Sequence, residues 1–252
     1  ERGYLDELAR QAVRMGLEPM QALQAITLTP AEHFRIEGLV GGLAPGRQAD
    51  MVLLPDLESF RPARVIARGQ VVAKDGRVTI PIPPVGFPEQ VFPVPHVMHP
   101  LTLNDLRIPA PPGRNRIRVR TIHFSGEIVT QTNVRELVVR GPDLLAEPEM
   151  DLLKVVAMDR RGRGQIARGF ISGYGLRRGA LAASLSFDTA NLILLGANDP
   201  DMLVAAERML VMGGGVVVAL DGAIQDEIPL PLGGIISDQP MGILANQIGA
   251  CQ

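Results

Sequence analysis

Histidine is the residue type of this chain best suited to metal or acid–base chemistry, because an imidazole can bind a metal ion or exchange a proton near neutral pH. The sequence holds four histidines, none in an H-x-H pair: His33, His96, His99 and His123. His96 and His99, three residues apart and flanked by prolines, are the best candidate pair, but no third ligand lies nearby in sequence. We therefore predict no complete catalytic metal site in this chain.

Asp188 and Asn191 are the candidates for contact with a small molecule. They lie between two apolar runs, a pattern typical of short buried strands whose ends meet at a common edge of a sheet. The alternative is a local turn in which both side chains bond nearby backbone amides.

The other polar motifs have structural explanations. We expect Asp199 to cap a helix, and residues 213–215 (GGG) to end it, since no P-loop lysine follows these glycines. Residues 160–163 (RRGR) predict a solvated basic turn. We expect His33 to serve in packing or capping and His123 to belong to a turn.

The charge balance argues against several classes of protein. The chain of 252 residues has 25 basic and 27 acidic side chains, well mixed, so no basic face for nucleic acid is visible. It has no apolar run of about 18 residues that could span a membrane, and no signal segment. The lone Cys251 fits a reducing compartment. We expect a soluble, cytoplasmic protein, and, because the chain begins inside a helical pattern without methionine, a fragment, cleaved product or truncated form.

Hydrophobic periodicity and turn residues predict a mixed α/β chain of the α+β class in two parts. Residues 1–80 predict three helices, at 4–15, 19–26 and from Pro30 with Thr29 in a capping box, then an antiparallel meander with strands at 51–54, 65–67, 71–73 and 78–80. The proline-rich residues 81–95 predict a linker.

Residues 96–252 predict a second domain. Its expected strands cover 117–122, 128–132, 137–139, 153–158, 166–171, 181–185, 192–195, 216–220 and 223–228. Its main helix is expected at 200–212, where apolar residues recur with helical period, and a last helix at 239–248.

Several motifs resemble those of known proteins. Residues 27–31 (TLTPA) resemble the T-x-N-P-A segment of the amidohydrolase superfamily, and 42–50 (GLAPGRQAD) resemble its G-x-I-A-P-G-x-x-A-D turn, in which Asp50 can bond backbone amides. In the second part the chain resembles the C-terminal domain of bacterial adenine deaminases. The matching segments are 96–103, 151–155 (DLLKV), 169–180 (GFISGYGLRRGA), 198–202 (NDPDM), 212–215 and 229–231.

The chain departs from that family at three histidine positions. The family usually carries histidine where Arg161 stands, and H-D-S-H-N where residues 187–191 read FDTAN. Asp188 and Asn191 are retained. The resemblance places them at a strand edge that faces the mouth of the catalytic barrel of the amidohydrolase superfamily. If the family's imidazoles assist deamination, this divergent member has altered or lost that contribution.

The resemblance implies the C-terminal part of a metal-dependent hydrolase that converts adenine and water to hypoxanthine and ammonia. It assigns residues 1–80 to the last barrel helices and a small β-sandwich segment, and a divalent cofactor (manganese, iron or zinc) to a barrel upstream, so this chain alone is expected to be inactive. The expected partners are that barrel segment or another chain, a homo-oligomer, and a purine-like small molecule. Two alternatives stay open: a non-catalytic subunit or pseudoenzyme that binds a partner or small ligand, and an amidohydrolase acting on another purine or cyclic amide.

Overall fold

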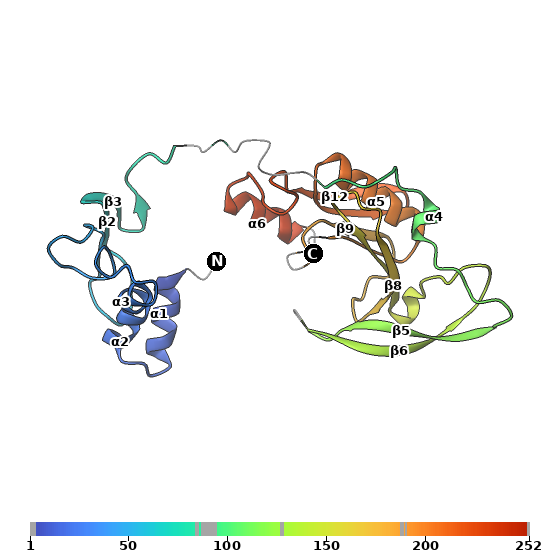
Figure 1. The fold of residues 1–252 in the computed structure, drawn as a ribbon, viewed down its shortest axis with the longest axis horizontal. Helices are drawn as coiled ribbons and strands as arrows, with labels where there is room; N and C mark the ends of the chain where they lie inside the picture. The colour runs from blue at the N-terminus through green and yellow to red at the C-terminus, as the bar shows by residue number, and fades with distance from the viewer. Residues whose placement is uncertain are drawn as a thin grey trace. The chain divides into compact units, whose positions relative to one another are not determined.

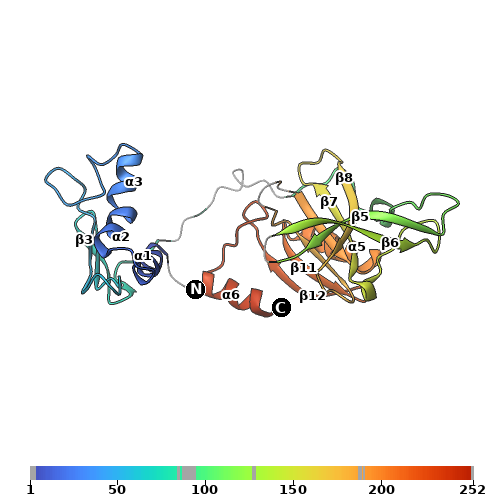
Figure 2. The same cartoon turned by 90° about the horizontal axis from the view of Figure 1, so that it is seen from below.

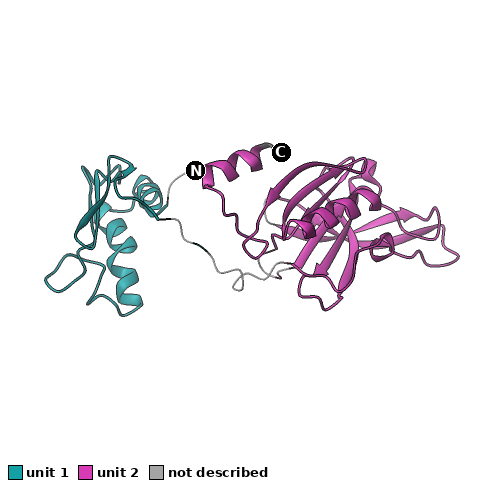
Figure 3. Ribbon diagram, turned by 90° about the horizontal axis from the view of Figure 1, so that it is seen from above, with its two compact units in different colours: residues 1–86 teal, residues 87–252 magenta. Residues whose placement is uncertain are grey.

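The computed structural model describes residues 4–83, 86, 95–126, 129–186, 189 and 191–250. The chain divides into two compact units, residues 1–86 and 87–252, coloured separately in Figure 3. Most of the predicted linker lies outside the described residues. Helices and strands occur in both units, so the mixed α and β class is confirmed, whereas the assignment of 1–80 to barrel helices and a sandwich segment stays a prediction.

Three short helices begin the first unit: α1 (Leu5–Arg14), α2 (Pro19–Ile26) and α3 (Leu28–His33). Ala9 of α1 and Ala22 of α2 are buried against Phe60, forming a small core. Pro19 is the first residue of α2, where its missing N–H costs no hydrogen bond. The predicted capping box at Thr29 is wrong, because α3 begins at Leu28, two residues before the predicted start at Pro30, and no side chain caps it.

The strands of the first unit form the predicted meander. Its four antiparallel strands follow chain order: β1 (Met51–Leu53), β2 (Arg64–Ala67), β3 (Gln70–Lys74) and β4 (Arg77–Val78). Asp50 accepts a hydrogen bond of 2.7 Å from the backbone amide of Arg68 in the β2–β3 turn. This bond is the main reason that the pKa of Asp50 is lowered, and it ties the turn motif to the sheet.

The second unit is built on an eight-stranded sheet in the order β12-β11-β9-β10-β7-β8-β5-β6. All neighbours are antiparallel except β5 and β8. The strands are β5 (Arg116–Phe124), β6 (Thr130–Val138), β7 (Leu152–Asp159), β8 (Ile166–Ser172), β9 (Ala180–Ala183), β10 (Asn191–Gly196), β11 (Gly215–Leu220) and β12 (Ala223–Pro229). The two strands predicted at 128–132 and 137–139 are one strand, β6, whose polar residues between them pair with β5.

Helix α5 (Asp199–Val211) covers one face of this sheet, as Figures 1 and 2 show. Its Met202 and Met209 are fully buried against Val156 of β7, Leu194 of β10 and Val217 of β11. Alternate residues of these strands therefore point into the core beneath α5, and the residues between them point to the opposite face. Burial of this continuous apolar layer is the main source of stability for the unit.

The first turn of α5 is fixed by polar side chains. Asn198 is the N-cap, and its side chain accepts a hydrogen bond of 2.8 Å from the amide of Asp201. The prediction that Asp199 caps the helix is wrong, because its carboxylate pairs with the buried Lys154 of β7 at 2.6 and 2.7 Å. The glycines at 213–215 follow the helix directly, as predicted: Gly213 and Gly214 close its last turn and Gly215 begins β11.

Among the described residues, the further helical segments are α4 (Leu103–Leu106), the 3-10 turn η2 (Pro148–Met150) and α6 (Met241–Ala250). No helix among the described residues has the length and hydrophobicity needed to cross a membrane.

Candidate functional site at one end of the larger sheet

Asn191 lies at the end of the larger sheet where β10 begins and β7 ends. It is the first residue of β10 and pairs directly with Asp159, the last residue of β7. Asp159 is joined in turn to Gln165, the residue before β8, because its amide donates a 2.9 Å hydrogen bond to the carbonyl of Gln165. Asp188, the second residue predicted from the sequence, lies outside the described residues.

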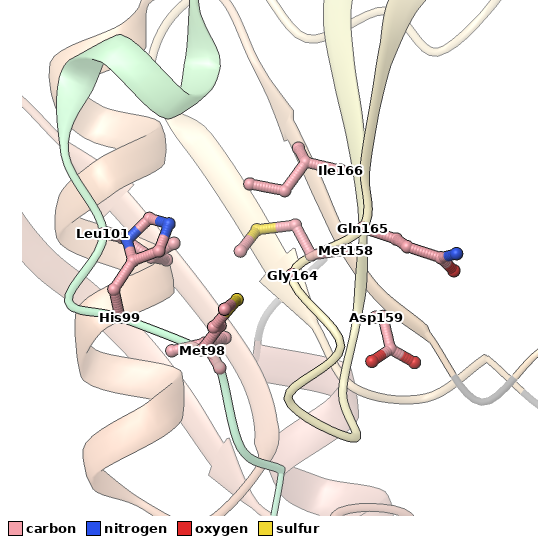
Figure 4. Close-up of a pocket in the computed structure, with 9 residues that line it drawn as sticks. Met98, His99, Leu101, Met158, Asp159, Gly164, Gln165 and Ile166 are labelled. Carbon is pink, nitrogen blue, oxygen red and sulfur yellow. The ribbon is translucent and has the colours of Figure 1, made fainter.

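Asp159, Gln165 and Asn191 share the sheet face opposite α5. Their neighbours Met158, Ile166 and Leu192 pack into the core under α5, so strand alternation directs these three polar side chains the other way. Figure 4 shows the side chains of Met158 and Ile166 pointing toward His99, whereas that of Gln165 points to the opposite side of the hairpin. The register therefore brings together polar residues that are up to 32 positions apart in sequence.

A pocket of about 240 Å³ lies among these side chains. It is lined by Ala157, Asp159, Gln165, Ile166, Ala167 and Asn191. Sequence reasoning identified Asn191 and missed both Asp159 and Gln165. The only signal for the latter two was their position at the two ends of the basic turn between two predicted strands.

The turn between β7 and β8 is organised by Asp159. One carboxylate oxygen, Oδ2, accepts hydrogen bonds from the amides of Arg161 at 3.2 Å and Arg163 at 2.8 Å. Gly162 has φ +73°, and a Cβ placed there would lie 2.6 Å from Cδ2 of His96. The turn is thus tightly folded and packs against the strand-like segment at His96, while the side chains of Arg161 and Arg163 are exposed, as expected for a solvated basic turn.

Arg160 leaves this basic cluster and points into the protein. Its guanidinium donates to the carbonyl of Gly233, and burial, with a smaller contribution from Arg161, lowers the pKa of Arg160 from its ordinary value. The neighbouring Ser184 is fully buried, accepts from the amide of Gly215 at 2.7 Å and donates to the carbonyl of Gly234. These bonds tie the loop at 233–234 to the same end of the sheet.

The histidines do not converge on a metal site. His96 packs on Gly162, whereas Nδ1 of His99 lies 3.0 Å from the carbonyl of Pro100 and its Nε2 lies 3.8 Å from Asp105. His123 lies within β5, where Nδ1 is 3.1 Å from the hydroxyl of Ser172, so the prediction that it belongs to a turn is wrong. His33 ends α3 and contacts the ring of Phe34 edge-on.

The described residues do not fit a divalent metal of the kind that the resemblance implies. Within them no group of three or more histidine, cysteine, aspartate or glutamate side chains is arranged to hold a metal ion. A catalytic zinc site, for comparison, needs about three protein ligands around an open position. What the site offers instead is a carboxylate and two carboxamides, which are hydrogen-bonding groups.

Two family models match the chain. The model of the adenine deaminase C-terminal domain matches residues 127–252, and that of the amidohydrolase family matches residues 3–74. The chain belongs to the adenine deaminase family. The resemblance drawn from the sequence motifs is confirmed, and the candidate site lies within the region matched by the C-terminal domain.

Individual adenine deaminases align with nearly the whole chain. The enzyme of Moorella thermoacetica is 37% identical over 98% of this chain and 42% of its own length. That of Methylobacterium nodulans is 38% identical over 95% of this chain and 41% of its own length. The enzyme of Clostridium botulinum strain Langeland is 34% identical over 98% of this chain and 41% of its own length. The chain thus spans about two fifths of the length of these relatives.

Proposed function

We propose that this chain is the C-terminal part of a hydrolase that converts adenine and water to hypoxanthine and ammonia. The observation that carries the proposal is the match of 98% of the chain to proteins named adenine deaminase. In this proposal residues 1–80 are the last barrel helices and a small β-sandwich segment, and the intact enzyme acts in the cytoplasm in purine metabolism.

The metal chemistry belongs, in this proposal, to residues outside this chain. A divalent ion (manganese, iron or zinc) supplies a polarised water in enzymes of this type. Since the described residues provide no such ligand group, the chain by itself is proposed to have no deaminase activity. Its own contribution is a folded unit that presents Asp159, Gln165 and Asn191, with Asp188 as a further candidate beside the substrate.

The partner that we propose is the barrel segment or another chain, in a homo-oligomer. Support comes from the first unit, where Tyr4, Leu8 and Met15 are 79%, 58% and 88% exposed on or beside α1. Large apolar side chains clustered on one element are typical of a surface that is covered in the assembly.

Two protein samples test the proposal: the 252-residue chain and the complete product of the reading frame that encodes it. Each is incubated with adenine and Mn²⁺, and ammonia release is measured. We expect release by the complete product and none by the chain alone. Turnover by the isolated chain, or a folded, metal-loaded complete product that leaves adenine unchanged, contradicts the proposal.

The substituted histidine positions favour a second function, that of a non-catalytic subunit which binds a small ligand. Arg161 lies two residues beyond Asp159, and residues 187–190 directly precede Asn191. Asp159 and Asn191 pair with each other across β7 and β10, so the three positions at which the family's histidines are replaced lie next to this pair in sequence. A complete product that binds adenine without releasing ammonia supports this second function.

A further inference from the structure

The larger sheet ends in two edge strands, β12 on one side and β6 on the other (Figure 1). An edge strand exposes backbone N–H and C=O groups with which another chain can pair, so proteins usually protect it with a bulge, proline or charged residues. β12 has all three kinds of protection. Its register with β11 shifts between Val218 and Ala219, it carries Asp226 and Glu227, and it ends at Pro229.

β6 lacks these protections. Its nine residues, Thr130–Val138, pair with β5 over their whole length without a shift in register, and none of them is proline. Its only charged residues are Arg135 and Glu136, whose charges cancel. A long, regular edge strand without net charge is a ready template for pairing with a further strand.

The outer edge of β6 is formed by the backbone groups of its even-numbered residues. The amide of Val139, directly after β6, donates to Asn115, directly before β5, so the odd-numbered residues bond toward β5 and the even-numbered ones face outward. Among the described residues, the only outward amide of β6 with a partner is that of Val134, which donates a 2.7 Å hydrogen bond to the side chain of Asn133. The rest of this edge can still accept a strand.

We infer that β6 pairs antiparallel with β6 of a second copy of this chain, about a twofold axis at Val134. Val134 is the middle residue of the strand, so this register pairs all nine residues. The inference deepens the homo-oligomer of the proposed function, on which the choice of a second copy as the partner rests. The resulting pairs are Val134 with Val134, Asn133 with Arg135, Thr132 with Glu136, Gln131 with Leu137 and Thr130 with Val138.

The charges and polar groups of β6 favour this register over its neighbours. An axis at Arg135 would set that residue directly opposite its copy, and like charges so placed are destabilising. An axis at Asn133 would leave Leu137 and Val138 without strand residues opposite them. With the axis at Val134, no like charges face each other.

Two polar groups gain partners in the paired state. Nε of Arg135 is buried and, among the described residues, has no hydrogen-bond acceptor. The amide of Val134 would donate to the carbonyl of the partner's Val134, which releases the side chain of Asn133. That carboxamide can then accept from the guanidinium of the partner's Arg135. The pairing also covers the side chain of Val134, which is 47% exposed in the single chain.

Self-association of the 252-residue chain tests the inference. Sedimentation equilibrium is measured from about 1 to 200 μM, because an interface made of one pair of strands is small and commonly weak. We expect reversible conversion of the 27.1 kDa chain to a species of twice that mass. A folded chain that stays monomeric over the whole range overturns the inference.

Charge exchange at the axis tests the register. Val134→Lys and Val134→Glu each set like charges opposite one another, so each should weaken self-association about tenfold or more. A mixture of the two variants should associate, because lysine then faces glutamate. Val211→Lys, the same substitution at an exposed residue that ends α5, is the control and should associate as the wild type does. Unchanged association of Val134→Lys, or a mixture no tighter than its components, overturns the inference.

Failure of this inference and failure of the proposed function give different results. A complete product that releases ammonia from adenine, but associates equally well with and without Val134→Lys, overturns the interface alone. A chain whose association follows the charges at position 134 supports the interface, even when the complete product leaves adenine unchanged.

Discussion

Lys154 and Asp159 lie toward the two ends of β7, and their surroundings differ. Lys154 is fully buried, and its ammonium group is paired with both oxygens of Asp199. Asp159 is half-buried and faces Gln165 and Asn191 across a pocket. At the Lys154 end the buried charged groups pair with each other, which stabilises the fold. At the Asp159 end hydrogen-bond donors and acceptors face solvent, where they are free to bind a ligand.

The largest effect on stability is expected at the Lys154 end of β7. Lys154→Met removes the partner of Asp199 and leaves its partly buried carboxylate unpaired, so the free energy of unfolding should fall by about 3 kcal/mol. Urea denaturation of the chain measures it. Arg178→Met breaks the exposed Arg178–Asp221 pair and serves as the control, with an expected change below about 1 kcal/mol. Equal effects of the two substitutions would remove the contrast between buried and exposed pairs.

The pKa of Asp201, in the first turn of α5 beside Asp199, predicts how the stability of this end of the sheet depends on pH. Burial raises the pKa of its carboxyl, but hydrogen bonds from Asn198 and from the amides of Gly222 and Asp221 outweigh burial and lower it overall. A lowered folded-state pKa adds stability above the unfolded value near 4, and this stability is lost as the pH falls through the folded-state pKa. Asp201→Asn should cost about 1–2 kcal/mol at pH 7, and the deficit should shrink below about pH 4. A deficit that stays constant down to pH 2 in urea titrations would show that the charge of Asp201 contributes nothing.

The sequence predicted local features of the fold well, and long-range pairing poorly. The span of α5 follows from its apolar period, and the strands from their apolar runs. The exchange of roles between Asn198 and Asp199 depends on Lys154, 45 residues earlier in the chain, which no local pattern indicates. Asn191 was predicted because it borders an apolar run, whereas Gln165 joined it only through the register of three strands.

At the Asp159 end of β7, a substitution of Gly162 tests whether the β7–β8 turn is rigid. Gly162→Ala places a methyl group at φ +73° and against His96, so we expect a loss of about 1–2 kcal/mol. Gly113→Ala is the control, because Gly113 has φ +71° and open space around it. The difference between the two variants in urea denaturation reports the contact with His96. If both variants lose the same stability, the segment at His96 does not brace the turn.

The smallest effect on stability is expected within the pocket itself. Asn191→Ala and Gln165→Ala remove carboxamides that make no side-chain hydrogen bond to any described residue, so each should change the free energy of unfolding by less than about 0.5 kcal/mol. In the proposed function, in which these residues lie beside the substrate, the same substitutions are expected to weaken adenine binding several-fold. Urea denaturation and calorimetry on one set of variants should therefore distinguish the two kinds of residue. Substitution of a residue that stabilises the fold lowers the free energy of unfolding, whereas substitution of a residue that binds the ligand weakens binding alone. A loss of 2 kcal/mol or more at Asn191, comparable to that at Lys154, would instead assign Asn191 to the fold, as the local-turn alternative requires.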